Sequence, residues 1–322
     1  MKIKQVPEDF IVKEKINLKL EEGSYTYFKL KKTNWNTITA VKEIAKKLNT
    51  KEKFLNYAGI KDKNAITEQV ISAYNISKNK LESLSIEGLD IEVIGTGKER
   101  VHTGLLVGNE FNIVIRDLDE VNEDKISFIP NYFGEQRFGI NATNHLAGKA
   151  IIKKDFKKAC EILNLEIIND PIATLRKNRR LLRLIFNSYQ SFIFNKALGE
   201  YIKLKSKDVK EVDFPFGKLV FSDYHDEIKL PLVHFDTEFD KDLENIYNKI
   251  LSEEEIKQRD FLIRQLPDLV EETQYRQAFT EVKDFSSKIE EDDLNQGKKK
   301  QMLSFTLSKG SYATIVVKFL YN

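Results

Sequence analysis

The stretch Gly59-Ile60-Lys61-Asp62-Lys63-Asn64-Ala65-Ile66-Thr67-Glu68-Gln69 carries more information about this chain than any other. Residues 67–74 are typical of a strand, so Asp62 is expected in a loop just before it, with Gly59 allowing a tight turn. Asp62 stands between two lysines, whose charges favour the ionised carboxylate. A positioned, ionised carboxylate can act as a nucleophile or as an electrostatic partner, and the plainer interpretation is a solvated turn aspartate.

Two shorter stretches on either side of it also combine charged and aromatic residues. Lys4 precedes Pro7-Glu8-Asp9-Phe10, and residues 10–16 predict a strand. A lysine near an edge strand of a sheet is usually a surface residue. Gly108-Asn109 predicts a turn, followed by an alternating, half-buried strand that contains Phe111. Phe111 is either a core residue or a ring whose open face stacks on a nucleobase.

The stretch Asn131-Tyr132-Phe133-Gly134-Glu135-Gln136-Arg137-Phe138-Gly139 interleaves aromatic residues with one arginine. This mixture suits a nucleic-acid surface, and a packed junction with glycine turns explains it equally well. A dense basic cluster without an acid among its members follows: Arg176, Lys177, Arg179, Arg180 and Arg183. Its density favours contact with phosphates over a merely solvated helix face. Residues 240–296, by contrast, hold sixteen Asp and Glu against eight Lys and Arg.

Length and composition bound the class of protein. The 322 residues are 41% hydrophobic, enough for one large or two ordinary domains and too apolar for a disordered chain. The formal charge of +2 excludes a polycation but not a local basic groove. Cys160 is the single cysteine, which excludes an internal disulfide and a cysteine-rich zinc site and favours a cytoplasmic location. No signal peptide and no membrane-spanning run of apolar residues is predicted.

Motifs for several reaction classes are absent. The four histidines are scattered without metal-binding spacing, and the chain has no Walker A motif and no GxGxxG motif. Ser188 and Ser191 lack the context of a nucleophile elbow. These absences weigh against phosphoryl transfer, nicotinamide chemistry and serine hydrolysis.

Strand-rich ends enclose a helix-rich middle. Strands are expected at residues 89–94 and 302–307 and again at 312–320, whereas 142–163 and 179–205 predict helices. Asn36 is expected to cap a further helix in the first part of the chain. This order favours an α+β class in which one domain is inserted into another, because a regular βαβ series is missing.

Five of these stretches, in this order, resemble the TruD family of tRNA pseudouridine synthases. The resemblance begins at Lys4 and Pro7-Glu8-Asp9-Phe10, and the GxKDxxAxTxQ element at 59–69 is its most specific part. It continues through Gly108-Asn109-Glu110-Phe111 and residues 131–139, and it ends at Gly310-Ser311-Tyr312-Ala313-Thr314. It therefore spans nearly the whole chain.

The resemblance implies both an architecture and a site. It implies a pseudouridine-synthase catalytic domain with a mixed or antiparallel sheet, residues 1–128 plus 280–322, interrupted by a helix-rich TRUD insertion domain at 129–279. Asp62 would be the catalytic aspartate, and Lys4 would pair with it. Phe111 would stack on the target uracil, Asn109 would support the active-site loop, and Phe10 would bind substrate.

The resemblance also implies the partners. The substrate would be tRNA, modified at the uridine of position 13 in the D-arm, with no cofactor and no metal. Phosphates of the RNA would be held by basic residues of the insertion: Arg137, Arg176, Arg179, Arg180 and Arg183. A cytoplasmic monomer that does not contact membranes is expected.

Two other functions stay open at this point. The basic cluster and the interleaved aromatics would suffice for a non-catalytic RNA-binding or RNA-folding protein. A hydrolase could use Asp62 as a nucleophile on a small glycoside, but a second carboxylate is expected in such an enzyme and only Glu68 is near in sequence.

Overall fold

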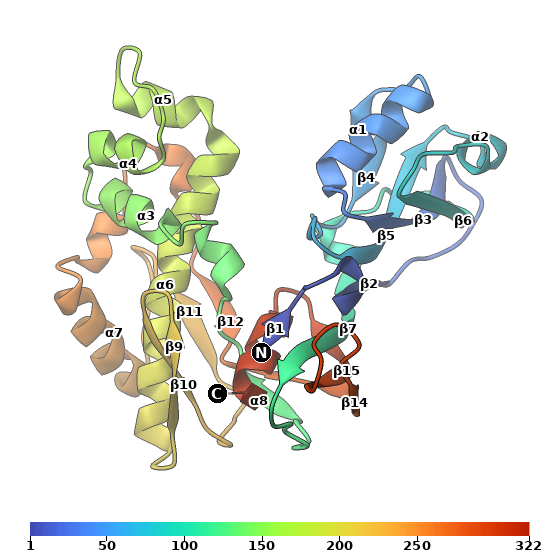
Figure 1. Ribbon diagram of the computed structural model, residues 1–322. Coiled ribbons are helices and arrows are strands. Elements are labelled where there is room, and N and C mark those ends of the chain that lie inside the picture. Colours follow the sequence, from blue (N-terminus) through green and yellow to red (C-terminus); the bar gives the residue numbers. More distant parts are fainter. Residues whose placement is uncertain (322) are drawn as a thin grey trace. The chain divides into compact units, whose positions relative to one another are not determined.

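The structure is a computed structural model that describes residues 1–321 (Figure 1). The chain forms two compact units. The first consists of residues 1–127 and 281–310, and the second of residues 128–280 together with the chain from 311 onward. Within the described part of the chain, no helix is long and apolar enough to cross a membrane.

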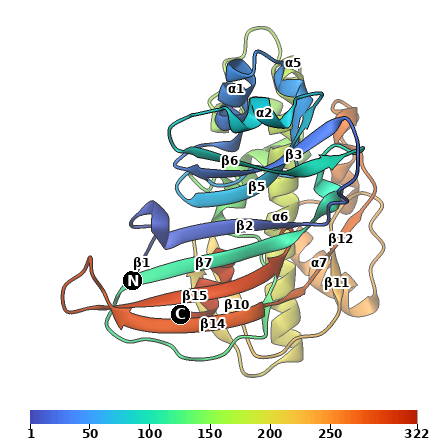
Figure 2. The same cartoon turned by 90° about the vertical axis from the view of Figure 1, so that its right-hand side faces the viewer.

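A mixed sheet forms the first unit, with the strand order β14-β15-β7-β2-β5-β3-β6 (Figure 2). Its strands are β1 (Lys2–Ile3), β2 (Phe10–Ile16), β3 (Tyr25–Thr33), β4 (Leu55–Tyr57), β5 (Ile66–Tyr74), β6 (Leu89–Gly97), β7 (Leu106–Leu118), β14 (Lys283–Glu291) and β15 (Lys299–Ser308). The short β1 pairs with β7, and β4 pairs with β5. The β2–β5 pair is parallel and the other pairs are antiparallel. Because β14 and β15 return from the far end of the sequence, the sheet joins both ends of the chain.

Helix α1 (Thr37–Lys47) covers one face of this sheet (Figure 1). The Asn36 side chain accepts a hydrogen bond from the Ile38 N–H and so caps the helix, as predicted. Apolar side chains of α1 and of the strands beneath it form a continuous core of buried residues: Phe28, Leu30, Val41, Ile44, Ala45, Ile71 and Ala73. The same face holds the candidate site at the point where α1 begins.

The second unit is rich in helices and is organised around the long α6 (Arg179–Lys205), against which α3 and α7 pack. Its other helices are α3 (Asn144–Ile152), α4 (Phe156–Ile162), α5 (Pro171–Lys177), α7 (Lys241–Glu253) and α8 (Ala313–Tyr321). Its strands form two-stranded sheets: β8 (Phe128–Pro130) with β13 (Phe279–Glu281), β9 (Lys210–Phe214) with β10 (Gly217–Phe221), and β11 (Lys229–Leu232) with β12 (Gln274–Gln277). The predicted bounds of α6 are confirmed, as is the α+β class with a helix-rich middle.

Two predicted elements differ from the structure. The helix expected at 142–163 is broken, because Lys154 adopts a left-handed φ of 63° and Asp155 caps a new helix. The strand expected at 312–320 is wrong, because this segment forms α8. Its Ala313, Val316 and Leu320 side chains recur at helical spacing and are buried, which a short run of β-branched residues does not reveal. This helix packs with β8, so the last residues belong to the second compact unit.

The turn predicted at Gly108-Asn109 is also wrong, since both residues lie inside β7. Gly108 pairs with Lys15 of β2 on one side and with Ser308 of β15 on the other. A Cβ on Gly108 would lie 2.3 Å from the Leu307 carbonyl oxygen. The glycine therefore permits a close approach of β15 and does not mark a turn.

Candidate active site

The centre of the site is an ion pair between two side chains that are 58 residues apart in the sequence. Lys4 Nζ lies 2.8 Å from Asp62 Oδ2, and about a quarter of each side chain is exposed (26% for both). Lys4 has a φ of 59°, a backbone conformation that costs a lysine about 1–2 kcal/mol. Its ammonium also lies 4.0 Å from the centre of the Phe10 ring. Strained backbone of this kind clusters at functional sites, and here it directs a cation at a carboxylate that solvent can reach.

A row of aromatic rings continues from Phe10 across the sheet. Phe10 meets Phe111 edge to face at 6.3 Å, and Phe111 lies 5.6 Å from Phe305. Phe111 is 6% exposed, so most of its ring packs in the core. Its predicted contact with a uracil therefore involves the small part of the ring that remains accessible.

The site lies where β2 and β5 part. The two strands pair from Ile11 with Ile66 to Lys13 with Glu68, and the main-chain pairing ends there. The buried Glu14 carboxylate fills the gap, since its Oε2 accepts the Val70 N–H at 3.0 Å. The Glu14 carboxylate therefore lies between the two diverging strands, where it can bind a side chain of the loop at 58–65.

Lys61 makes that connection. Its ammonium lies 3.3 Å from Glu14 Oε1 and donates to Asn109 Oδ1 at 2.5 Å. Asn109 thus holds the residue next to Asp62, which agrees with the loop-supporting role that the resemblance implies. The role of Asn109 in catalysis stays a prediction. From the sequence, Lys61 has a role only as a charge beside Asp62, and Glu14, which lies outside the stretches that carry the resemblance, has none.

Two buried polar side chains hold the main chain of the loop at 58–65. Thr37 Oγ1 accepts the Lys61 N–H at 3.0 Å and donates to Gln69 Oε1 at 2.9 Å. Gln69 Nε2 donates in turn to the Gly59 carbonyl oxygen at 3.2 Å. Gly59 is expected to permit a tight turn, but its backbone does not use the freedom that is special to glycine. Its φ lies outside the left-handed region, and a Cβ there would meet no described atom within 4 Å.

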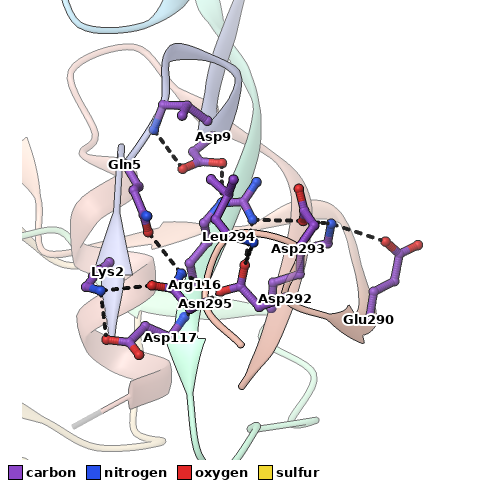
Figure 3. Close-up of polar contacts among 12 residues, drawn as sticks. Lys2, Gln5, Asp9, Arg116, Asp117, Glu290, Asp292, Asp293, Leu294 and Asn295 are labelled. Carbon is purple, nitrogen blue, oxygen red and sulfur yellow. Dashed lines mark hydrogen bonds and ion pairs between the residues drawn. The ribbon is translucent and has the colours of Figure 1, made fainter. Parts of the chain in front are cut away.

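The segment that carries Lys4 is fixed by a network around the buried Arg116, shown in Figure 3. Arg116 Nε donates to Asp9 Oδ1 at 2.8 Å, and Nη1 donates to Asp292 at 2.7 Å and to Asp293 at 3.0 Å. Asp9 also closes the turn before it, since its Oδ2 accepts the Val6 N–H. These four residues, here called the Arg116 network, join the N-terminal segment to β7 and to the turn between β14 and β15.

Further contacts extend this network toward the first residues of the chain (Figure 3). Asn295 donates to Gln5 at 3.0 Å and accepts from Lys2 at 2.9 Å. Lys2 also lies 3.3 Å from Asp117, whose N–H donates to Asp292. Residues 2, 5 and 9 are thus held on both sides of Lys4.

Arg116, Asp292 and Asp293 change one another's pKa values. Burial alone would raise the pKa of Asp292, but backbone N–H donors, Asn295 and Arg116 hold that pKa well below its usual range. Hydrogen bonds from Lys300 and Arg116 lower the pKa of Asp293 to about 2. Burial would lower the pKa of Arg116, and the three aspartates raise it. The carboxylates of Asp292 and Asp293 therefore stay ionised throughout the neutral range.

Arg137 belongs to the second unit, where the aromatic residues of 131–139 are packed inward. Tyr132, Phe133 and Phe138 are all buried, which favours the packed-junction interpretation of this stretch. Arg137 Nε donates to Ser191 Oγ at 3.0 Å, and its guanidinium lies 5.4 Å from the Phe133 ring. Burial lowers the pKa of Arg137. Its predicted contact with RNA phosphate stays a prediction.

The arginine cluster of Arg176, Arg179, Arg180 and Arg183 spans the end of α5 and the first turns of α6, and all four side chains are exposed. Cations at the start of a helix oppose its dipole, at a cost of about 0.3–1 kcal/mol each. Acids distant in sequence offset this cost, because Arg179 lies 3.4 Å from Asp268 and Arg183 lies 3.6 Å from Glu271. Part of the acidic segment at 240–296 therefore pairs with the cluster, which the local sequence did not indicate.

The predicted site residues thus fall into two groups, one in each unit. Lys4, Phe10, Asp62, Asn109 and Phe111 come together in the first unit, and Arg137 and the arginine cluster lie in the second. Among residues 1–321, no group of three or more His, Cys, Asp or Glu side chains is placed to hold a metal ion.

The chain is similar to known proteins of one family. The family model described as tRNA pseudouridine synthase D (TruD) matches residues 1–179 and 169–319. A probable tRNA pseudouridine synthase D from Nanoarchaeum equitans is 30% identical, covering 100% of this chain and 98% of that protein. One from Methanosarcina acetivorans is 28% identical over 98% of this chain and 91% of its own length. The crystal structure of a putative tRNA pseudouridine synthase D from Methanosarcina mazei has a TM-score of 0.73 at 27% identity, covering 99% of this chain and 92% of that one.

Proposed function

The chain belongs to the tRNA pseudouridine synthase D (TruD) family, and from this premise we propose that it converts the uridine at position 13 in the D-arm of tRNA to pseudouridine with Asp62 as the nucleophile. It is an RNA pseudouridine synthase, an isomerase. The observation that carries the assignment of the nucleophile is the contact of 2.8 Å between Asp62 and Lys4 inside the most specific motif of the chain.

The reaction needs a nucleophile and no net change in oxidation state. The bond from uracil N1 to ribose C1′ breaks, the base turns, and a bond from C5 to C1′ forms. A proton leaves C5 and a proton is added at N1, so substrate and product are isomers. Asp62 must be ionised in order to attack either uracil C6 or ribose C1′.

Lys4 pairs with the charge of Asp62. Its ammonium lies 2.8 Å from Asp62 Oδ2 and holds this oxygen in place where the side chain is three-quarters buried. Lys61 is engaged with Glu14 and Asn109, so its task is to orient the loop. Lys4 and Asp62 together form the catalytic pair in this proposal.

The target base has to leave its stack to reach Asp62. Extrusion of a base costs a few kcal/mol, and stacking on an aromatic ring returns about 1–3 kcal/mol. We place the extruded uracil against the exposed part of the row formed by Phe10 and Phe111, next to Lys4. Arg137 and the arginine cluster would bind phosphates, so tRNA binding should weaken as salt rises.

The test is to map pseudouridine on tRNA transcripts treated with the wild type, with Asp62→Ala, and with Asp90→Ala as a control. Asp90 is an exposed aspartate on β6 in the same unit. We expect modification at one D-arm uridine by the wild type and by Asp90→Ala, and none by Asp62→Ala. Modification by Asp62→Ala would refute the role of Asp62. Salt-sensitive binding by all three without modification would point to an RNA-binding protein, and turnover of free uridine would point to a hydrolase.

A further inference from the structure

Lys32 is a buried lysine for which the mechanism above has no use. It lies on β3 in the row of side chains that also contains Phe28 and Leu30, and it is 0% exposed. Lysine is almost never fully buried unless it is paired, and burying its ammonium is costly. Methionine or leucine would fill the same position without this cost. The charge and the donors of Lys32 therefore need a reason beyond packing.

The contacts of Lys32 show what the ammonium does. Its Nζ donates to the main-chain carbonyl oxygen of Asp62 at 2.7 Å and to that of Trp35 at 2.6 Å. Trp35 precedes the helix cap Asn36 and the loop-binding Thr37. One buried cation thus ties the peptide unit of Asp62 to the turn that starts α1.

This contact completes a set of buried attachments along one short loop. Gln69 holds the Gly59 carbonyl, Thr37 holds the Lys61 N–H, and Lys32 holds the Asp62 carbonyl. The first two attachments are hydrogen bonds between neutral groups, whereas a hydrogen bond from a charged donor is about twice as strong. The strongest attachment therefore acts on the residue that bears the nucleophile.

We propose that Lys32 is a positioning residue of the isomerase, whose buried ammonium fixes the main chain of Asp62 so that the carboxylate meets Lys4. The inference rests on the proposed function, and it adds a second lysine with a separate task. Lys4 acts on the carboxylate from the solvent side, and Lys32 acts on the peptide group from the core side. Lys32 does not touch the reacting atoms.

The pKa of Lys32 predicts a pH dependence by which this role can be tested. Burial lowers the pKa of Lys32 to about 8, with Asp62 raising it and Lys61 lowering it. Its neighbours across the sheet are the uncharged Thr67 of β5 and Leu89 of β6, so Asp62 and Lys61 are the charged side chains that act on it. A group with this pKa is charged below pH 8 and loses its charge as the pH rises above that value.

The experiment compares the full-length wild type with Lys32→Met and with Lys31→Met. Lys31 is the exposed neighbour on the same strand and serves as the matched control. For Lys32→Met we expect a fall in kcat of about 100-fold with KM changed less than threefold, because an interaction that orients the nucleophile affects the chemical step. In the wild type and in Lys31→Met, kcat should decline above about pH 8, and this decline should be absent from Lys32→Met.

Hydrogen exchange supplies a readout that does not depend on activity. In Lys32→Met, the amides of residues 59–63 should lose protection while α1 and the strands of the sheet retain theirs. Wild-type kcat with an unchanged alkaline decline in Lys32→Met would overturn the proposal. General loss of protection, with kcat per folded molecule unchanged, would overturn it as well, because Lys32 would then be merely structural. If the wild type modifies no RNA, the proposed function fails, and the exchange pattern still decides whether Lys32 fixes the loop.

Discussion

The Arg116 network and the arginine cluster use the same two side-chain types in opposite surroundings. In the network, the side chains of Arg116, Asp9 and Asp292 are 8%, 0% and 0% exposed. In the cluster, Arg179 and its partner Asp268 are 75% and 41% exposed. The attraction between two charges is several-fold stronger in a protein interior than in water, where salt also screens it. The network can therefore fix a geometry, whereas the cluster can only bias where an anion binds.

This difference matches the tasks of the two regions. The N-terminal segment must keep Lys4 at one point beside Asp62, in a strained backbone conformation, so it needs rigid attachments on both sides. A surface that binds the RNA backbone must release it again, and exposed arginines that exchange between acids and phosphates suit that need. The buried charges of the Arg116 network position Lys4, whereas the exposed charges of the arginine cluster are suited to binding RNA.

The largest effect on the free energy of unfolding is expected when the Arg116 network loses its arginine. Arg116→Met leaves Asp9 and Asp292 buried without a counter-charge, which should cost about 3–5 kcal/mol of unfolding free energy. Urea unfolding followed by far-ultraviolet circular dichroism measures this free energy and reports on both units. Arg179→Met, which breaks an exposed pair, should change the same free energy by less than about 0.5 kcal/mol. Equal effects of the two variants would contradict the comparison.

The next largest effect is expected on kcat, when the pair of Lys4 and Asp62 is broken. Lys4→Met should lower kcat about 10- to 100-fold, because a hydrogen bond to a charged group is worth about 1.5–3 kcal/mol. Single-turnover conversion of a tRNA transcript measures this rate. Lys2→Met is the matched control, since Lys2 lies in the same segment and contacts Asn295 and Asp117, which adjoin the Arg116 network, and not Asp62. A loss of similar size in Lys2→Met would mean that the segment, and not the Lys4 ammonium, sets the rate.

How much of this arrangement the sequence predicts depends on the range of the interaction. Three local signals are confirmed, since Asn36 caps α1 and the strand at residues 10–16 and the helix at 179–205 have the predicted bounds, whereas the strand expected at 312–320 forms a helix. The resemblance named Asp62 and Lys4 as a pair, and the structure places them in contact across 58 residues of sequence. Without a family motif, no spacing rule connects two residues so far apart.

The supporting residues were missed for physical reasons. Arg116 and Asp292 are 176 residues apart, and neither stands in a pattern that indicates burial. Lys32 could have been found, because the alternation of Phe28, Leu30 and Lys32 places it on the apolar face of its strand. Gly108 was misassigned because glycine serves both turns and close strand approaches, and only the position of β15 tells them apart.

The smallest effect tests the exposed side of the comparison. The double variant Asp268→Asn with Glu271→Gln releases Arg179 and Arg183 from their acids. Because exposed pairs contribute about 0.2–1 kcal/mol, the affinity for tRNA should rise no more than about fivefold at low salt, with a steeper salt dependence and unchanged stability.

The matched control, Asp208→Asn with Glu244→Gln, removes two exposed acids of the same unit that form no ion pair among the described residues. If both double variants bind tRNA equally well, net charge explains the change, and the arginine cluster has no privileged contact with phosphate. If only the first gains affinity, the acids at 268 and 271 compete with RNA for the same arginines, as screened and exchangeable pairs should.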